Sequence, residues 1–433
     1  MVNKKKILII SSANPVIGAG VGASDMYQLF IEKGYDVDLL TKYKINGYDS
    51  FLSVYDKNEK DAFFTSKMGL IFNALLHRLF FRQKKGYHFF YKKESCPPVP
   101  IKKVLKKINK SYDFVIVYFW QSMLSFATVQ AIHEKLKTQF IFVSADYSIM
   151  SGGCHFTIDC DKFKTGCGAC PAIFSNSKND FTSYNVSFRD FFFKYVKPII
   201  VANSYMINTF YKESYLLKNY DRLECVYPRI DHSKYYPMNK EFLMNELGIS
   251  DSRKFIMFFG CQSLNDKRKG LSYLINALNI FYDKLEDDDK DKILILVAGR
   301  NYEGIKDLIP FKSINFGYVS NDFLPKLYSV SSVFLSPSVH DAGPMMLVQS
   351  IACGTPVVSF NVGYALDLVK NTGTGYCASN FDSIDFSNGI SNIYNLSIDK
   401  YSELREKCRK VSIELTSNAS FIEAFEKIFE KYK

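Results

Sequence analysis

The chain has 433 residues, of which 47% are hydrophobic and 23% charged, and its formal net charge is +11. These values exclude a disordered or fibrous protein, and the length predicts two domains rather than one hydrophobic core. Residues 4–6 are basic and lead into a short apolar strand and then polar and glycine residues, which does not match a signal peptide. The sequence contains no run of about 20 apolar residues, the length that a helix needs to span a bilayer. A cytoplasmic location is therefore expected.

The first fifty residues predict the start of a Rossmann-like domain. A strand in "KKKILII" is followed by a loop containing Gly18, Gly20 and Gly22, a helix ending at Gly34 and a second strand. The glycines are related to a dinucleotide fingerprint, but no acidic residue is convincingly placed to bind a ribose. The glycine loop alone is weak support for NAD binding.

Positive charge is concentrated in residues 78–110, which contain eleven basic residues and a single acid, Glu94. Aromatic residues are interleaved with the basic ones, and the apolar "MGLIFNALLHRLFF" immediately precedes most of them. Basic residues attract anionic headgroups while aromatic rings settle at the interface, so this segment predicts peripheral docking to the inner face of the membrane. A solvated basic face with buried aromatics is the alternative. Binding of single-stranded nucleic acid is a further one, but no nucleic-acid motif accompanies the segment, and no nucleic-acid partner is expected.

Four of the ten cysteines cluster in "GGCHFTIDCDKFKTGCGACP", at Cys154, Cys160, Cys167 and Cys170. Four thiolates with a Cys-x-x-Cys pair suit a tetrahedral structural zinc site that staples an irregular loop. Reduced cysteines without a ligand and an iron–sulfur cluster are the alternatives, and His155 could replace one thiolate as a ligand.

A strand in "FIFVS" runs into the loop that carries Asp146 and His155. Such a loop opens at the carboxyl end of a parallel sheet, where α/β proteins place their sites. Asp146 and His155 are therefore candidates to orient or deprotonate a hydroxyl group of an acceptor.

The second half alternates strands and helices in the manner of a parallel sheet. The strands "SVFLSPS" and "TPVVSF" are separated by a helix expected at residues 345–352. Gly343 and Pro344 lie at the helix start, where free amides and the helix dipole predict an anion site. Asp341 is placed to contact sugar hydroxyls, and Gln349 to reach a ribose or similar diol.

At these residues the sequence resembles retaining nucleotide-sugar glycosyltransferases of the GT-B type, particularly glycosyltransferase family 4. The family's Glu, seven residues, Glu frame is matched by Asp341 and Gln349, followed by "IACGTPVVSF". Both acidic positions depart from the family pattern, and the change to Gln349 removes a charge. The resemblance implies two Rossmann-like α/β domains facing a cleft.

The same resemblance implies roles for further residues. Arg268 and Lys269 would face the donor diphosphate, with Arg268 standing in for an arginine that the family usually has after the strand glycine. The amides of residues 343–346, including Met345 and Met346, would stabilise the leaving group. The loop of Gly317, Tyr318 and Val319 would approach the nucleotide base. Gly20 and Gly22 would lie across the cleft from the donor, and no catalytic metal is expected.

The cysteine segment resembles a subgroup of polysaccharide-assembly glycosyltransferases with "GGCH...C..F..GC..CP" in the acceptor domain. The implied function is retaining sugar transfer from a nucleotide diphosphate donor to a hydroxyl of a lipid-linked or oligosaccharide acceptor. A catalytically inactive sugar-nucleotide-binding protein and a GT-B nucleotide-sugar epimerase are the alternatives. The expected organisation is an acceptor domain at residues 1–231, a linker at 232–252, a donor domain at 253–410 and a terminal segment at 411–433. The helix expected at about residues 420–432 in that last segment would pack back on the first domain.

Overall fold

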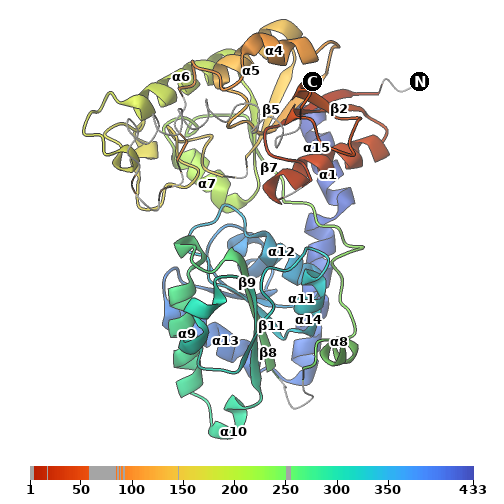
Figure 1. Cartoon of the computed structure of the whole chain (residues 1–433), viewed down its shortest axis with the longest axis vertical. Coiled ribbons are helices and arrows are strands. Elements are labelled where there is room, and N and C mark those ends of the chain that lie inside the picture. The colour runs from red at the N-terminus through yellow and green to blue at the C-terminus, as the bar shows by residue number, and fades with distance from the viewer. Residues whose placement is uncertain are drawn as a thin grey trace. The chain divides into compact units, whose positions relative to one another are not determined.

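The computed structural model describes residues 4–16, 18–57, 84, 87, 89–90, 93–144, 146–249 and 255–433. The chain forms two compact units (Figure 1). The first unit comprises Met1–Asn203, Ile207–Val226 and Ile422–Lys433, and the second comprises Ser204–Met206 and Tyr227–Phe421. Residues 232–249, the described part of the segment expected to form a linker, lie within the second unit. They contain helix α8 (Lys240–Glu246), where the Asn239 side chain accepts a hydrogen bond from the Phe242 amide at 2.8 Å.

The first unit is built on a parallel sheet with strand order β3-β2-β1-β4-β5-β6-β7 among the described residues. Its strands are β1 (Lys6–Ser11), β2 (Asp36–Tyr43), β3 (Leu52–Tyr55), β4 (Phe114–Phe119), β5 (Gln139–Ser144), β6 (Ile199–Ala202) and β7 (Leu223–Cys225). Its helices are α1 (Val21–Glu32), α4 (Ile101–Lys107), α5 (Phe126–Leu136), α6 (Phe181–Val196), most of α7 (Tyr205–Glu213) and most of α15 (Asn418–Lys431).

Helices cover both faces of this sheet. On one face, Phe114 of β4 lies 4.6 Å, between ring centroids, from Phe429 of α15, and Phe429 packs against Phe30 of α1. Phe142 of β5 is paired in register with Val117, three residues beyond Phe114, so its side chain points to the opposite face. There it stacks on Phe126 of α5 at 5.4 Å. The terminal helix α15 is thus part of the core of the first unit.

The second unit has a parallel sheet with strand order β10-β9-β8-β11-β12-β13. Its strands are β8 (Phe255–Ser263), β9 (Ile293–Arg300), β10 (Ser313–Asn315), β11 (Val333–Ser336), β12 (Val357–Phe360) and β13 (Gly375–Ala378). Besides α8, its helices are α9 (Leu271–Asp283), α10 (Asp287–Lys290), α11 (Leu324–Val330), α12 (Met345–Ala352), α13 (Ser383–Tyr394) and α14 (Ile398–Thr416), with a π-helical turn at Leu366–Lys370.

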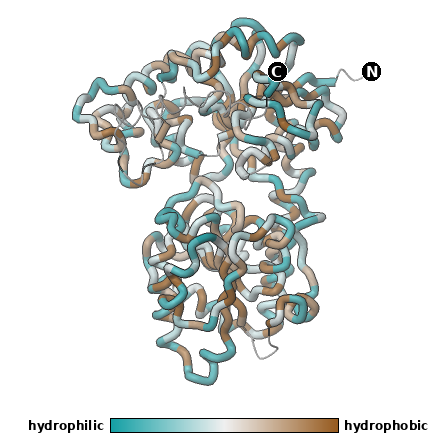
Figure 2. Tube along the Cα trace, viewed as in Figure 1, coloured by the Kyte–Doolittle hydropathy of each residue, from teal (hydrophilic) through white to brown (hydrophobic). Residues whose placement is uncertain are grey.

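Alternate residues of β8 enter two separate hydrophobic cores. Ile256 and Phe258 pack with residues of α8, α11, α12 and α14, whereas Met257 and Phe259 pack with residues of α9 and α13. The strands at the centre of this unit carry its most hydrophobic residues (Figure 2). A sheet covered on both faces explains why its strands are continuous apolar runs rather than alternating ones.

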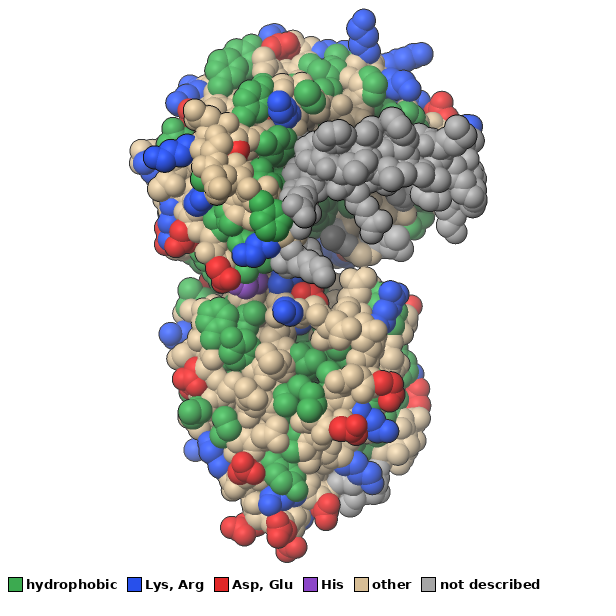
Figure 3. Space-filling view, turned by 60° about the vertical axis from the view of Figure 1, so that its left-hand side comes forward, with side chains coloured by type: hydrophobic (Ala, Val, Ile, Leu, Met, Phe, Trp, Pro, Cys, Tyr) green, Lys and Arg blue, Asp and Glu red, His purple; other side chains and the backbone are tan. Residues whose placement is uncertain are grey.

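The surface of the second unit that is turned toward the viewer in Figure 3 carries Lys and Arg side chains interspersed with Asp and Glu. In the part of the chain that the structure describes, every helix is too short or too polar to span a bilayer.

Much of the basic and aromatic segment at residues 78–110 lies outside the described residues. Two lysines of its described part form ion pairs at the surface, Lys107 with Asp56 and Lys110 with Asp36, both at 2.9 Å.

Candidate functional site

The strand order of the second unit reverses between β8 and β11. From β8 the chain continues to β9 and β10 on one side, and then crosses to β11, β12 and β13 on the other. Because β8 and β11 are parallel neighbours, the loops that follow them, residues 264–270 and 337–344, leave the same edge of the sheet side by side. Open α/β sheets bind ligands at such a switch point, outside the carboxyl ends of the strands.

The two loops are joined through their backbones. The Arg268 carbonyl accepts hydrogen bonds from the amides of Val339 and His340, at 2.8 and 3.3 Å. Gly270 has φ +65°, and a Cβ atom at this position would overlap the carbonyl oxygen of Pro337. Only glycine fits this backbone conformation and this close approach without strain. Gly270 and the backbone of Arg268 therefore fix the relative position of the two loops.

An ion pair between Lys269 and Asp341 stands at this junction. The Lys269 Nζ lies 2.5 Å from Asp341 Oδ2, and the side chains are 24% and 14% exposed. The other carboxylate oxygen, Oδ1, accepts a hydrogen bond from the Gly343 amide at 3.0 Å. Asp341 therefore orients the lysine and shapes the turn into α12 at the same time.

Helix α12 begins at the residue expected from the sequence, Met345. Of the four residues predicted to offer amides to an anion, Pro344 has no N–H and Gly343 donates to Asp341. The hydrogen bonds of the described residues leave the amides of Met345 and Met346 for a ligand. These amides point from the positive end of the helix dipole, which favours an anion.

Arg268 forms an ion pair within its own loop. Its guanidinium donates to Asp266 at 2.6 and 3.2 Å, so its charge is already paired. Burial raises the pKa of Asp266, but the hydrogen bonds and charge of Arg268 outweigh burial and hold this pKa below its usual value. Lys269 differs from Arg268 in its partner, because Asp341 also accepts a hydrogen bond from the Gly343 amide, next to the start of α12.

Gln349 turns its carboxamide toward the protein. Its Oε1 accepts a hydrogen bond at 3.0 Å from the hydroxyl of Tyr328. Burial raises the pKa of Tyr328 well above its usual value, so the hydroxyl keeps its proton and donates. The NH₂ group of Gln349 is a donor, whereas a glutamate would have a second acceptor oxygen at this place.

The loop of Gly317, Tyr318 and Val319 follows β10 at the same edge of the sheet. Gly317 has φ +63°, and its carbonyl accepts from the Gly299 amide at 2.7 Å. Tyr318 is 61% exposed, and the Arg300 guanidinium lies 4.9 Å from the centroid of its ring. Arg300 was not predicted as a site residue, although its position at the end of the strand "ILILVAGR" was a signal.

Gly20 and Gly22 belong to the first unit, whereas the other predicted donor residues belong to the second. Gly22 lies in the first turn of α1, and a Cβ there would overlap the Tyr118 hydroxyl. A Cβ at Gly20 would overlap the Asn14 carbonyl. Both glycines are therefore explained by close packing within the first unit.

Asp146 and His155 come together in the loop after β5. The His155 Nδ1 lies 2.6 Å from Asp146 Oδ2, and the second carboxylate oxygen accepts from the Ser148 amide at 2.8 Å. The Tyr147 amide donates to the His155 carbonyl at 2.9 Å, which closes the loop. With Nδ1 facing the carboxylate, Nε2 is the imidazole nitrogen that remains for a substrate. Asp146 thus orients the imidazole of His155, whose side chain is 30% exposed.

A buried ion pair supports this loop and was not predicted. Arg189 of α6 is fully buried, and its guanidinium lies 2.5 Å from Glu94 Oε1. Arg189 also donates to the carbonyls of Ser148 and Ser151. The signal in the sequence was Glu94, the lone acid in a strongly basic segment, whose second oxygen accepts from the Phe126 amide at 3.0 Å.

All four clustered cysteines line one small pocket of the first unit. Among the described residues, no three histidine, cysteine, aspartate or glutamate side chains are placed so as to hold a metal ion. The zinc site stays a prediction.

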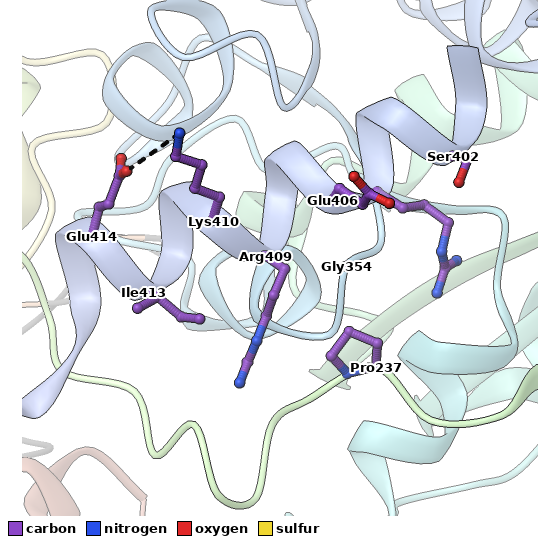
Figure 4. A pocket seen from close by; sticks show the side chains of 9 residues that line it. Pro237, Gly354, Ser402, Glu406, Arg409, Lys410, Ile413 and Glu414 are labelled. Atoms are coloured by element: carbon purple, nitrogen blue, oxygen red, sulfur yellow. Dashed lines mark ion pairs between the residues drawn. The ribbon is translucent and has the colours of Figure 1, made fainter. Parts of the chain in front are cut away.

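A larger pocket of the second unit lies beside α14 (Figure 4). Its residues Pro237, Gly354 and Arg409 come from three separate segments. The Arg409 guanidinium donates to the carbonyls of Tyr235 and Ala352, at 2.7 and 2.8 Å. This arginine holds the surrounding backbone, and the pocket contains none of the predicted site residues.

Residues 239–413 match the family model described as glycosyl transferases group 1. An uncharacterized glycosyltransferase of Methanocaldococcus jannaschii is 30% identical over 134 residues, which cover 30% of this chain and 33% of the relative. The O-antigen chain mannosyltransferase B of Escherichia coli is 24% identical over 129 residues, which cover 28% of this chain and 32% of the relative. The chain thus spans about a third of the length of these two relatives.

The structure of Anabaena HepE in complex with UDP-glucose superposes with a TM-score of 0.62 and 13% identity, covering 98% of this chain and 99% of that one. Two parallel-sheet Rossmann-like domains match those of GT-B glycosyltransferases, so the predicted fold class is confirmed.

Proposed function

We propose that this protein, whose residues 239–413 match the glycosyl transferases group 1 family, transfers a sugar from a nucleotide diphosphate donor to a glycan hydroxyl. The observation that carries the proposal is the Lys269–Asp341 pair beside the N-terminus of α12, at the switch point of the second sheet. An ammonium and two helix amides suit a diphosphate whose negative charge grows as the sugar leaves. The O-antigen chain mannosyltransferase among the relatives supports an acceptor in surface polysaccharide synthesis.

The proposed roles follow from the contacts of each residue. Lys269 and the amides of Met345 and Met346 bind the diphosphate, and Asp341 holds Lys269 and approaches the sugar. Gln349 donates to the ribose through its NH₂ group. Tyr318 offers an exposed ring on which the base can stack. The Arg268 carbonyl positions the loop that carries Lys269, because it accepts hydrogen bonds from the amides of Val339 and His340.

Transfer is proposed to retain the anomeric configuration. The bond between the sugar C1 and the diphosphate oxygen breaks, and the acceptor oxygen bonds to C1 on the same face. The acceptor proton passes to the departing diphosphate, so charge and atoms balance. The Nε2 of His155, held by Asp146, accepts the acceptor hydroxyl and orients it.

The acceptor is proposed to be lipid-linked, which would place the protein at the inner face of the membrane. The support is the composition of residues 78–110, where basic and aromatic residues alternate. The pairing of Lys107 and Lys110 with aspartates leaves this role to the other basic residues of the segment.

Thermal unfolding with a panel of nucleoside diphosphates and nucleotide sugars tests the donor site, because a ligand that binds the folded state raises the melting temperature. One nucleotide sugar and its diphosphate are expected to raise it selectively. The His155→Ala variant should keep that shift and lose transfer, whereas Lys269→Met should lose the shift. Absence of a shift with every nucleotide would contradict the proposal.

A further inference from the structure

The loop between β5 and α6 contains little regular structure. Residues 147–180 include only two short 3-10 turns, Lys162–Lys164 and Pro171–Ile173. Four consecutive residues, 166–169, have positive φ, and two of them are Cys167 and Ala169 rather than glycine. Left-handed backbone costs free energy for such residues. Hydrogen bonds from the Gly168 amide to the Thr182 hydroxyl at 3.0 Å and from the Cys170 amide to Asp180 at 2.9 Å help to hold this conformation.

The four cysteines of the loop face one pocket. Cys154, Cys160, Cys167 and Cys170 all line it, together with the rings of Phe89 and Phe163. Cys154 is fixed from outside, since it forms a β-bridge with Phe89. Sulfur atoms from positions sixteen residues apart in the sequence therefore share one apolar cavity.

Backbone amides point at two of the sulfur atoms. The Gly152 amide donates to Cys167 Sγ at 3.4 Å. The amides of Ala172 and Ile173 donate to the sulfur of Cys170. Both sulfur atoms are thus held by backbone N–H groups of the same loop.

Glycines at three positions let the loop close on this pocket. A Cβ at Gly152 would overlap Thr182, one at Gly153 would overlap Phe89, and one at Gly168 would overlap the Lys178 carbonyl. The glycines of the "GGC" and "GCGAC" segments thus allow the backbone to pack closely in the part of the loop that carries the cysteines.

We propose that Cys154, Cys160, Cys167 and Cys170 bind one Zn²⁺ ion as a tetrathiolate structural site. Four soft thiolate ligands with a Cys-x-x-Cys pair select zinc, which they hold tetrahedrally at about 2.3 Å. As placed, no three of these side chains are arranged to hold an ion. Each sulfur moves by rotation about the single Cα–Cβ bond, so metal binding requires side-chain rotation within a preformed cavity.

The proposed ion would also fix the imidazole described above. His155 directly follows Cys154, and its Nδ1 meets Asp146 at 2.6 Å. Binding at Cys154 would therefore limit motion of the backbone that carries His155. The zinc inference does not depend on the proposed transfer reaction, because it rests on the loop alone.

Metal analysis of the full-length protein, purified without chelator, tests the inference. About one zinc ion per chain is expected in the wild type and in the control Cys96→Ser, whose cysteine is exposed and outside the loop. The double variant Cys167→Ser/Cys170→Ser should contain at least tenfold less zinc. Loss of zinc should lower the melting temperature of the double variant, and treatment with a chelator should lower that of the wild type.

A second measurement keeps the test valid if the double variant does not fold. Co²⁺ added to the metal-stripped wild type should give the visible absorption bands of tetrahedral cobalt with sulfur-to-metal charge transfer. Folded wild type that contains no zinc and gives no such bands would overturn the inference. Iron bound in place of zinc would also overturn the inference. Disulfide bonds in the loop would overturn it too, and each would lower the mass of the unreduced protein by two hydrogens.

Discussion

Replacing Lys269 with methionine should weaken nucleoside diphosphate binding about a hundredfold. Methionine keeps the length and apolar character of the side chain but removes the charge, which lies 2.5 Å from Asp341 in a pair that is less than a quarter exposed. Two unit charges about 4 Å apart at an effective dielectric of about 20 interact with about 4 kcal/mol.

Part of that energy is offset, because Lys269 must be desolvated and shares its charge with Asp341. A net loss of about 2–3 kcal/mol remains, which corresponds to a factor of about 30–150 in affinity. The variant also leaves the Asp341 carboxylate facing the diphosphate, which adds repulsion. Asp341 keeps its hydrogen bond from the Gly343 amide, so the melting temperature of the free protein should fall by only a few degrees.

Isothermal titration with the diphosphate selected by the thermal panel measures this change. The matched control is Lys267→Ala, which removes an exposed lysine from the same turn. The control should bind within about twofold of the wild type. Equal affinities for the wild type and Lys269→Met would refute the assignment of this loop to the diphosphate.

Three further predictions concern stability and loop geometry. Gly270→Ala should weaken diphosphate binding and lower the melting temperature, because its φ of +65° and the Pro337 carbonyl exclude a Cβ; unchanged affinity would contradict the role of this turn. Lys240→Met should stabilise the second unit by about 1–3 kcal/mol at pH 7, because burial lowers the pKa of Lys240 from 10.5 to about 8. Between pH 8 and pH 10.5 the unfolded state binds more protons than the folded state at this lysine. The melting temperature of the wild type should therefore rise with pH in this range relative to that of the variant. Arg189→Met should cost about 3–5 kcal/mol by leaving Glu94 buried and unpaired, and an unchanged unfolding temperature would refute this account.

The sequence predicted the parts of the fold that local pattern determines. Apolar runs bounded by turn residues identified β11 and β12, and the helix between them begins and ends where it was expected, at Met345–Ala352. Periodicity and turn chemistry are local properties, so they can be read without knowing the tertiary structure.

Contacts between distant residues could not be predicted in the same way. Arg189 and Glu94 are 95 residues apart, and their pairing depends on how α6 packs on the sheet. The same holds for Tyr328 and Gln349, whose hydrogen bond depends on the packing of α11 against α12. Within the segment 232–252, which was expected to be a linker, helix α8 buries Leu243 and Met244 in the second core. Tertiary packing, which sequence pattern does not report, decided each of these cases.

Release of nucleoside diphosphate from each nucleotide sugar of the panel, with and without glycolipid acceptor, tests the central claim most directly. The account predicts that one donor is consumed and that the acceptor increases the rate. The product should retain the anomeric configuration by NMR, and Lys269→Met should slow release about a hundredfold. Binding of a nucleotide sugar without release of diphosphate, or return of an epimerised donor, would contradict glycosyl transfer.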